Sequence, residues 1–307
     1  QSHTKGFLVS FALRDPIHDY IRVDDLEAAV LQSRPLQRLR FVRQLGLANL
    51  VFPGAEHSRF GHVLGAMELA GRVYDALAEK TPDVLENHPR AIDRRRVRLA
   101  ALLHDIGHAP FSHSAEELFE GGIEHEQMTT RLLQLPELTS LLDVEIGTES
   151  IAGILSGKGD STDRLLSQIV SGDLDADKMD YLLRDSHYCG VRYGNYDLGR
   201  LLETIEPLQD PETGTWGIGI DEGGVHAFEA LVLARYYMFS QVYFNVTGKV
   251  LELHLNEWLE RSGARWPADP LEFLEHDDHS VWWKMRQSDD LHARAILDRD
   301  HYLLAFE

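Results

Sequence analysis

The feature that most constrains the fold is the segment AALLHDIGHAPFSH, which covers residues 100–113. It begins as an apolar run typical of a buried helix and leads directly into His104 and Asp105. A polar group moved into an apolar environment costs several kcal/mol unless a partner binds it there. The segment therefore predicts a buried helix carrying polar groups, and their partners are either neighbouring protein groups or a metal ion.

The net charge restricts the partners that the surface can bind. The chain has 307 residues, of which 50 are acidic and 30 basic, so its formal net charge is −20 at pH 7. Surfaces that coat DNA or RNA are basic, so we expect no general nucleic-acid binding. No apolar run approaches the ~18 to 20 residues of a membrane span, so we expect no membrane association. A nucleotide substrate is still compatible, because a metal ion and a few basic side chains can make one pocket positive.

The cysteine content bears on both the compartment and the metal chemistry. Cys189 is the single cysteine of the sequence, which excludes an internal disulfide and fits a reducing compartment. We expect no signal peptide at the start of the chain and a cytoplasmic location. A single thiol also leaves His, Asp and Glu as the plausible metal ligands.

Hydrophobic periodicity predicts an all-α fold with minor β-hairpin decoration. We expect a single domain over residues 1–307, with short strands and a turn in 1–25, a helical core in 26–262 and C-terminal helices in 263–307. The strands flank the turn at Asp15-Pro16, and a second hairpin is expected within residues 213–224. The expected helices are two segments broken near Pro35, then 57–80, 94–108, one from Ser114, 162–171, 176–188, 225–262 and two short helices in 270–307.

The dipeptide His-Asp is too common in this composition to be informative by itself. It occurs three times, as His18-Asp19, His104-Asp105 and His276-Asp277. The second lies inside an apolar helical pattern, whereas the other two lie among turn or polar residues. We therefore treat His104-Asp105 as the candidate metal-binding pair.

Other histidines could belong to the same site. His62 lies on the helix predicted upstream, off its apolar stripe. His104 and His108 are four residues apart, which places both on one helical face. His113 directly precedes Ser114, where a capping box predicts a helix start whose amides favour an anion.

Carboxylates on a later helix could complete the ligand set. Asp177, Tyr181 and Asp185 are spaced to share one face of the helix predicted for residues 176–188. That face is either solvated or part of a site. Two imidazoles and two carboxylates from separate helices favour Mn, Fe, Zn or Ni over Ca or a bare Mg site.

The order His62, His104-Asp105, Asp177 is the signature of the HD phosphohydrolase superfamily, and this sequence resembles its members. It is similar in particular to the HD-domain deoxynucleoside triphosphate triphosphohydrolases, which include the vertebrate SAM-and-HD-domain dNTPase and bacterial relatives. The similarity runs from about residue 13 to residue 307. The matching motifs are DPIHDYI, RPLQRLRFVRQLG, VFPGAEHSRFGHVLGAMELAG, LLHDIGHAPFSH, HEQM, DADKMDYLLRD and ARYYMFSQVY.

The resemblance implies a role for each matching residue. The implied ligands of a divalent metal (Mn, Fe, Zn, Ni or Mg) are His62, His104, Asp105 and Asp177. The residues implied around the scissile phosphate are His108, His113, His125 and Glu126. The implied triphosphate contacts are Arg59, Lys178, Arg235 and Tyr243. The implied deoxyribose contacts are Gln44 and Asp185 at the 3′-hydroxyl and Leu45 and Tyr181 beside C2′.

The implied chemistry is hydrolysis of a dNTP at the α-phosphorus, which releases a deoxynucleoside and inorganic triphosphate. The metal would activate the attacking water. His113 or His108 would protonate the departing 5′-oxygen, because a histidine titrates near neutral pH. Arg59, Lys178 and Arg235 would neutralise the triphosphate, since phosphoryl transfer depends mainly on positioning and electrostatics.

The resemblance also implies a homo-oligomer, a tetramer or a hexamer, with possible allosteric activation by a nucleotide. Relatives that guanine nucleotides activate have an acidic residue just before the proline of the PxQRLR segment. Here Ser33 and Arg34 precede Pro35. This departure argues against GTP as the activator and leaves other nucleotides open.

Two other functions stay open. An HD phosphodiesterase or nuclease would use the same metal on oligonucleotides, cyclic dinucleotides or an alarmone. It would need an open basic groove, which the acidic composition disfavours. A non-catalytic dNTP-sensing module would be expected to lack a ligand or a phosphate-facing histidine, and none is missing. The intact set favours an enzyme.

Overall fold

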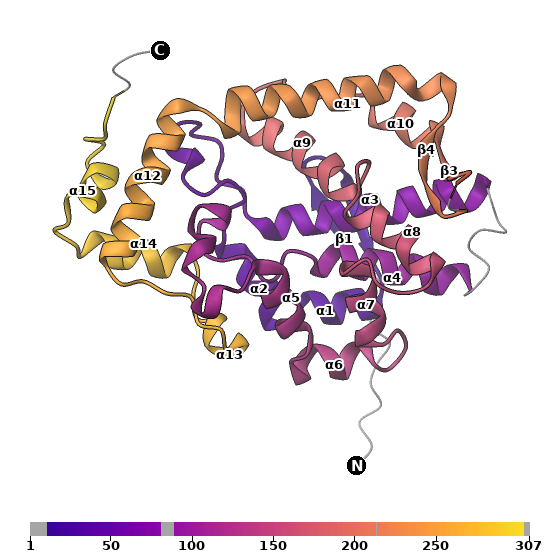
Figure 1. Cartoon of the computed structure of the whole chain (residues 1–307), viewed down its shortest axis with the longest axis horizontal. Coiled ribbons are helices and arrows are strands. Elements are labelled where there is room, and N and C mark those ends of the chain that lie inside the picture. Colours follow the sequence, from indigo (N-terminus) through magenta and orange to yellow (C-terminus); the bar gives the residue numbers. More distant parts are fainter. Residues whose placement is uncertain (1–10, 81–88, 213, 304–307) are drawn as a thin grey trace.

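The structure is a computed structural model that describes residues 11–80, 89–212 and 214–303, with the side chains of His113 and Ser114 outside the described part. Over these ranges the fold is all-α with two small antiparallel hairpins, which confirms the predicted fold class (Figure 1). The α-helices are α1 (Asp25–Leu31), α2 (Arg34–Arg38), α3 (Arg59–Lys80), α4 (Arg90–Leu103), α5 (His125–Leu133), α6 (Pro136–Leu142), α7 (Thr148–Leu155), α8 (Ser161–Val170), α9 (Ala176–Cys189), α10 (Leu198–Thr204), α11 (Val225–Met238), α12 (Val246–Arg261), α13 (Pro270–Phe273), α14 (Asp278–Arg286) and α15 (Leu291–Leu297). The strands are β1 (Phe11–Asp15), β2 (Asp19–Val23), β3 (Ile205–Gln209) and β4 (Trp216–Ile220). The 3-10 helices are η1 (Leu39–Phe41), η2 (Ala48–Leu50), η4 (Ser112–Leu118), η5 (Glu120–Gly122) and η6 (Glu222–Gly224), and η7 (Phe239–Tyr243) is a π-helix.

Helix α3 crosses the middle of the molecule and is buried on most of its circumference (Figure 1). Helices α4, α8 and α9 pack around it. A helix covered on most sides is apolar around most of its surface, as Val63, Met67 and Val73 illustrate. The stripe predicted from the sequence understates this burial, and His62 is only 1% exposed. Any polar group on this part of α3 therefore needs a partner from a neighbouring helix.

The first hairpin pairs β1 with β2, and hydrogen bonds within the turn fix its geometry. The Asp15 Oδ1 atom accepts the N–H groups of Ile17 and His18 at 2.8 and 2.9 Å, which forms an Asx turn between β1 and β2. This confirms the turn predicted at Asp15-Pro16. It also directs His18 toward α9, where its Nε2 contacts Asp180.

The start and end of α9 are fixed by local signals. The Asp175 side chain caps the helix by accepting the Lys178 N–H at 2.6 Å. Gly190 ends it with a φ of +71°, in the left-handed region that glycine adopts without strain. The predicted helix over 176–188 is therefore confirmed, and Asp177 and Asp180 lie in its first turn and a half.

Helix α4 ends earlier than the sequence predicts. It stops at Leu103, so His104 and Asp105 lie in a turn just beyond it, and His104 and His108 do not share a helical face as predicted. The turn passes close to α5, because a Cβ placed on Gly107 would lie 2.2 Å from a backbone oxygen of that helix. The His-Asp pair is therefore carried by a turn that packs closely against α5.

The segment that follows this turn also differs from the prediction. A 3-10 helix, η4, covers Ser112–Leu118, and its first flanking residue, Phe111, has a left-handed φ of +58° with no side-chain cap. The helix predicted to start at Ser114 therefore begins two residues earlier and is a 3-10 helix, and the predicted Ser114 cap lies outside the described side chains. The chain turns sharply here because Phe111 is anchored from elsewhere, as described below.

The C-terminal half has more breaks than predicted. The helix expected over 225–262 is interrupted by η7, and Asn245 restarts it by accepting the Gly248 N–H at 3.2 Å. The second hairpin pairs β4 with β3 and not with a strand inside 213–224. The described part of the tail has three helices, α13 to α15, instead of two.

None of the helices in the described ranges is long and apolar enough to cross a membrane. The single-domain organisation over residues 1–307 stays a prediction.

Candidate metal centre and active site

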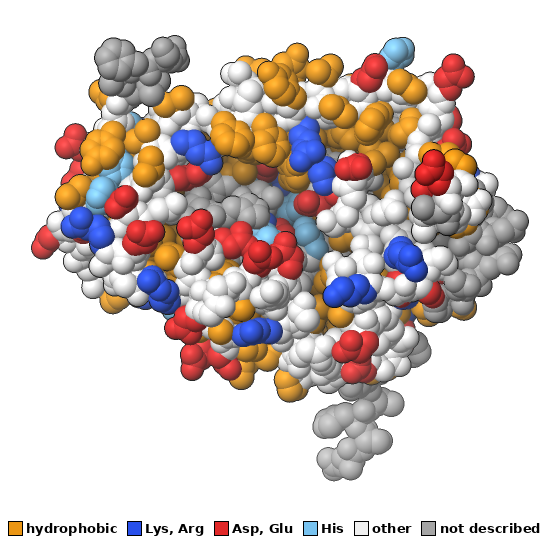
Figure 2. All heavy atoms as spheres, viewed as in Figure 1, with side chains coloured by type: hydrophobic (Ala, Val, Ile, Leu, Met, Phe, Trp, Pro, Cys, Tyr) orange, Lys and Arg blue, Asp and Glu red, His pale blue; other side chains and the backbone are white. Residues whose placement is uncertain are grey.

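One cavity of about 820 Å³ gathers most of the predicted site residues. Figure 2 shows pale blue histidine side chains inside a hollow in the middle of one face. Lys178 and Arg235 do not line this cavity, and the His113 side chain lies outside the described part. The other predicted residues line it: Gln44, Leu45, Arg59, His62, His104, Asp105, His108, His125, Glu126, Asp177, Tyr181, Asp185 and Tyr243.

A group able to hold a metal lies at one end of the cavity. Ligand atoms of His62, His104 and Asp177 all lie within 4.8 Å of one another. The Asp177 Oδ1 atom is 2.9 Å from His62 Nε2 and 3.5 Å from His104 Nε2. Asp105 adjoins them, with Oδ1 3.2 Å from His104 Nε2 and Oδ2 3.8 Å from His62 Nε2. Helix α3, the turn after α4 and helix α9 therefore bring four potential ligands together.

The two imidazoles are oriented as metal ligands require. The His62 Nδ1 atom lies 2.9 Å from Asp180 Oδ2, and His104 Nδ1 lies 2.7 Å from the Ala101 carbonyl oxygen. Metal-binding histidines commonly donate their other ring N–H in this way. The His104 Nε2 atom is buried and has no hydrogen-bond partner among the described residues. The donor set and its orientation thus fit a divalent metal.

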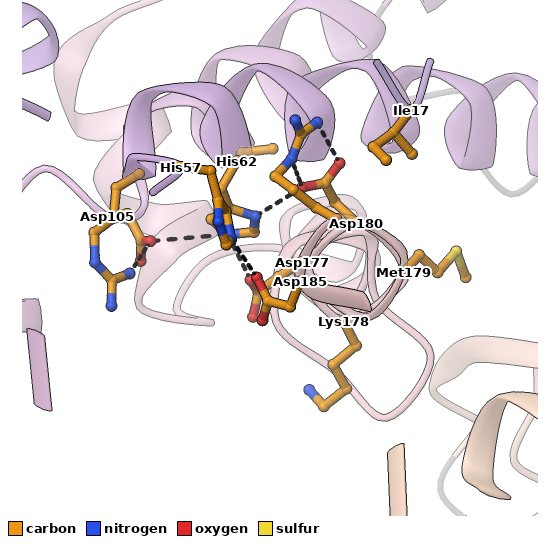
Figure 3. A network of polar contacts seen from close by, with 12 residues as sticks. Ile17, His57, His62, Asp105, Asp177, Lys178, Met179, Asp180 and Asp185 are labelled. Carbon is orange, nitrogen blue, oxygen red and sulfur yellow. Dashed lines mark hydrogen bonds and ion pairs between the residues drawn. The ribbon is translucent and has the colours of Figure 1, made fainter. Parts of the chain in front are cut away.

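Asp180 is a residue that the sequence analysis missed. It is 0% exposed and faces His62 (Figure 3). It also contacts His18 Nε2 and Arg184 Nε, both at 2.7 Å. A signal was present in the sequence, because Asp180 lies beside Met179 on the buried side of α9. A carboxylate there must be paired, since an unpaired buried charge is strongly destabilising.

The carboxylates make this end of the cavity a site for positive charge. Burial lowers the pKa of His62, but hydrogen bonds to Asp177 and Asp180 outweigh burial and raise that pKa to about 10. Burial raises the pKa of Asp177, yet His104 and His62 hold it below its ordinary value. A divalent cation among the same groups would satisfy both carboxylates and displace the His62 proton.

Arg59 connects the metal end to the neighbouring loops. It pairs with Asp105 through Nη1 and donates from Nε to Ser112 Oγ at 2.9 Å, with all three side chains buried. Burial raises the pKa of Asp105, but Arg59 and nearby histidines hold it well below its ordinary value. Burial and then Arg59 lower the pKa of His108, whose Nε2 lies 3.1 Å from Asp105 Oδ1. Ser112 was not predicted as a site residue.

A second cluster lies beside His108. The His125 ring stacks on the His108 ring with centroids 4.1 Å apart. The His125 Nδ1 atom pairs with Glu116 and lies 3.3 Å from Glu126 Oε2. Ligand atoms of Glu116, His125 and Glu126 also lie within 4.8 Å of one another. Glu116, which the sequence analysis missed, thus fixes the ring that faces His108.

Another part of the cavity lining offers groups suited to a hydroxylated ring. The Tyr243 hydroxyl donates to Asp185 Oδ2 at 2.7 Å, and His57 Nε2 lies 2.8 Å from Asp185 Oδ1. The rings of Tyr181 and Tyr243 meet edge to face, with centroids 6.3 Å apart. The Gln44 Oε1 atom is buried without a hydrogen-bond partner among the described residues. These groups combine hydrogen-bonding atoms with flat apolar walls.

Two residues predicted to contact phosphate lie outside the cavity. The Lys178 ammonium donates to Asp175 Oδ2 at 2.6 Å and to the Gly172 carbonyl oxygen at 2.8 Å. Arg235 is exposed on α11, with its guanidinium 5.5 Å from the centre of the Phe239 ring. Neither side chain lines the cavity, so their assignment as phosphate contacts stays a prediction.

Comparisons with known proteins agree with this arrangement. The HD domain matches residues 59–185, and the HD associated region matches residues 197–302. A Dictyostelium discoideum protein named deoxynucleoside triphosphate triphosphohydrolase SAMHD1 homolog is 32% identical over 285 residues, which are 87% of this chain and 53% of that protein. The solved structure of a hypothetical protein from Aquifex aeolicus superposes with a TM-score of 0.82 at 32% identity, over 95% of this chain and 76% of that one. That of a phosphohydrolase from Bacteroides thetaiotaomicron VPI-5482 gives 0.81 at 27%, over 96% and 78%.

A helical fold whose cavity brings His and Asp side chains from three segments to one point has the architecture of the HD phosphohydrolases. The chain belongs to the HD-domain family, with an HD domain followed by an HD associated region. It spans about half the length of the curated relatives that it matches.

Proposed function

We propose that the protein is a metal-dependent dNTP triphosphohydrolase, which cleaves a dNTP into a deoxynucleoside and inorganic triphosphate. The observation that carries this proposal is that one cavity holds both a metal-binding group and the polar and aromatic groups around Asp185 and Tyr243. The similarity to proteins named deoxynucleoside triphosphate triphosphohydrolase supports it.

The residues divide into three proposed roles. His62, His104, Asp105 and Asp177 would hold the metal, which when bound supplies Lewis acidity and water activation at the α-phosphorus. His108, His113, His125 and Glu126 would surround the scissile phosphate, and Arg59, Lys178 and Arg235 would neutralise the triphosphate. Tyr243 would join these phosphate contacts, and Gln44, Leu45, Tyr181 and Asp185 would seat the deoxyribose, with Gln44 and Asp185 at the 3′-hydroxyl and Leu45 and Tyr181 beside C2′.

We propose a divalent metal, for which manganese is the probe of choice, a cytoplasmic location and a homo-oligomer, a tetramer or a hexamer, that is open to regulation by a nucleotide. Nitrogen and oxygen donors in equal number favour Mn, Fe, Zn or Ni over Ca. The exposed apolar side chains of α11 support the oligomer, because large apolar patches commonly mark interfaces.

Product analysis tests the reaction directly. Manganese-loaded protein would be incubated with each dNTP singly, all four together, rNTPs, dNMPs and a short single-stranded oligonucleotide, and products would be separated by anion exchange. We expect deoxynucleoside and triphosphate from dNTPs, and none from the His104→Ala variant. Activity confined to the mixture would reveal activation by a second nucleotide.

Two outcomes would replace the proposal. Cleavage of the oligonucleotide with intact dNTPs would make the protein a phosphodiesterase or nuclease of the same family. Tight dNTP binding with no product under any condition would make it a nucleotide-sensing module.

A further inference from the structure

Asp278, the first residue of α14, is tied to two loops that line the cavity, although it lies far from them in the sequence. It is 1% exposed. Its Oδ2 accepts the Arg43 N–H at 2.9 Å, and its Oδ1 accepts the Phe111 N–H at 2.8 Å. The cap of α14 itself is Asp277, which accepts the Ser280 N–H at 2.8 Å. Both carboxylate oxygens of Asp278 therefore accept hydrogen bonds from segments outside its own helix.

The loop at Phe111 has a backbone that needs such support. Phe111 and Ser112 have φ values of +58° and +57°, in the left-handed region where residues other than glycine are strained. Trp282, also on α14, packs edge-on against the Phe111 ring with centroids 5.8 Å apart. A Cβ on Gly46 would lie 3.3 Å from the Phe111 oxygen, so the two loops are in close contact. Helix α14 thus holds this conformation through a carboxylate and an aromatic ring.

The connection continues from Ser112 into the metal end of the cavity. The Ser112 hydroxyl accepts from Arg59 Nε at 2.9 Å and donates to the Arg43 carbonyl oxygen at 3.1 Å. Arg59 in turn pairs with Asp105. The orientation of the Arg59 guanidinium therefore depends on a hydroxyl whose backbone Asp278 positions.

Arg38 supplies an independent tie between the same C-terminal segment and the turn after α4. Its guanidinium is buried, donating from Nε to the His276 carbonyl oxygen at 2.7 Å and from Nη2 to the His108 carbonyl oxygen at 2.9 Å. Residues 276–278 are thus joined to the loop at two positions, to His108 through Arg38 and to Phe111 through Asp278.

We propose that Asp278 is a positioning residue for the hydrolytic site. Its carboxylate holds the amides of Arg43 and Phe111 so that Ser112 fixes the Arg59 guanidinium against Asp105, on the wall where the triphosphate would lie. This inference deepens the proposed function and rests on it for its kinetic test. It gives the HD associated region a part in the site, next to His276-Asp277, which the sequence places among turn or polar residues.

The Asp278→Asn variant tests the proposal, because it keeps the volume of the side chain and one acceptor but turns an NH2 group toward the second amide. We expect kcat/KM for dNTP to fall by roughly 10- to 100-fold, as is typical when a partner of a site residue is removed. Faster hydrogen exchange in the peptides that contain Arg43 and Phe111 should accompany the loss. The affinity for Mn²⁺ alone should change less than about twofold, because the Asp278 carboxylate bonds to the amides of Arg43 and Phe111 and to none of the four proposed ligands, Asp105 included.

Asp277→Ala is the matched control, since it removes the cap of α14 and leaves the Asp278 contacts in place. It should lower Tm while kcat/KM and the exchange of both peptides stay near wild type. Unchanged exchange and kinetics in Asp278→Asn would overturn the proposal. Equal loss of activity in both variants would also overturn it, because it would show that only the stability of α14 matters.

A double-mutant cycle with Ser112→Ala tests the route of the effect. Because both residues act on Arg59, we expect the double variant to lose little more activity than the more damaged single variant. Independent, multiplicative losses would contradict the route through Ser112. A wild type that hydrolyses no dNTP would refute the proposed function instead. The positioning role would then be decided by inorganic triphosphate binding to the manganese-loaded protein, where Asp278→Asn must bind at least about tenfold more weakly.

Discussion

At the scale of single residues, the metal centre depends on what holds each imidazole. His62 has one ring nitrogen on Asp180 and the other near Asp177, so its ring has little freedom to turn. Asp180 is itself fixed by His18 and by Arg184. These contacts hold the His62 ring in one orientation before any ligand binds. Less conformational entropy is therefore lost when the ligand binds.

Replacement of Asp180 by Asn should weaken metal binding, because the amide cannot hold His62, His18 and Arg184 together. We expect the Kd for Mn²⁺ to rise by about 10- to 100-fold, measured by isothermal titration calorimetry. Asp75→Asn is the control, since Asp75 lies on α3, the helix of His62, but pairs with Arg94 at the surface. Wild-type affinity in a folded Asp180→Asn protein would show that Asp180 stabilises the fold only.

Metal binding should release a proton from His62. In the metal-free protein its pKa of about 10 lies above that of a free imidazole, so His62 is protonated at pH 7.5 and the metal must displace the proton. Affinity for Mn²⁺ should therefore rise with pH up to about 10. By the same linkage, protonation of His62 stabilises the metal-free fold fully below the ordinary pKa of 6.5, and this contribution is lost as pH rises through 10.

Calorimetry in buffers of different ionisation enthalpy measures the protons released per metal. We expect about one proton to be released for each metal ion bound at pH 7.5. A value near zero, with an affinity independent of pH, would show that His62 is already neutral in the metal-free protein.

At the scale of elements, the site depends on the turn between α4 and α5. Gly107 lies so close to α5 that a Cβ would be 2.2 Å from the His125 carbonyl oxygen and 2.5 Å from the Thr129 nitrogen. Because both atoms belong to the backbone of a helix, neither can move alone. The position of His125 relative to His108 is therefore set by the absence of a side chain at residue 107.

Gly107→Ala should push α5 away from the turn and separate the two stacked rings. We expect a loss of stability of about 1–3 kcal/mol, typical of overpacking, with a clear fall in kcat. Thermal unfolding and dNTP hydrolysis would measure the two effects. Gly199→Ala in α10 is the control, because its Cβ would meet only a side-chain oxygen at 3.5 Å and alanine favours a helix. A Gly107→Ala protein with wild-type Tm would contradict the packing argument.

At the scale of the whole molecule, the apolar residues of α11 are divided between two sides. Ala227, Leu231 and Ala234 are buried against the domain, whereas Leu233 and Tyr236 are 51% and 64% exposed. Figure 2 shows apolar side chains gathered along the edge of the molecule where α11 runs in Figure 1. A helix that is apolar on both sides is usually covered on both.

Leu233→Glu should therefore reduce the oligomer that we propose to a smaller species. Each added charge would be repelled by the acidic surface of a second copy as well as buried at the interface. Light scattering coupled to size exclusion would measure the mass. Leu208→Glu, at an exposed position on β3, is the control. A wild-type protein that is monomeric at micromolar concentration would contradict the oligomer itself.

The sequence by itself determined the helical class of the fold and most of the elements near the site. The stretches that became α3, α8 and α9 and the turn at Asp15-Pro16 are specified by neighbours within a few residues, through periodicity, caps and turn chemistry. The order of His62, His104-Asp105 and Asp177 pointed to the cluster that the fold brings together. Their roles as ligands stay a prediction until a metal is measured.

Only the tertiary structure decided how those residues are held. Helix α4 ends at Leu103, just before the His-Asp pair, and Lys178 pairs with Asp175 and does not line the cavity. Asp180 and Asp278 act through partners more than 100 residues away, as the pairs Asp180–His62 and Asp278–Phe111 show. Local patterns cannot encode such pairs, because a buried carboxylate signals only that it needs a partner. Which partner it finds is fixed when the helices pack.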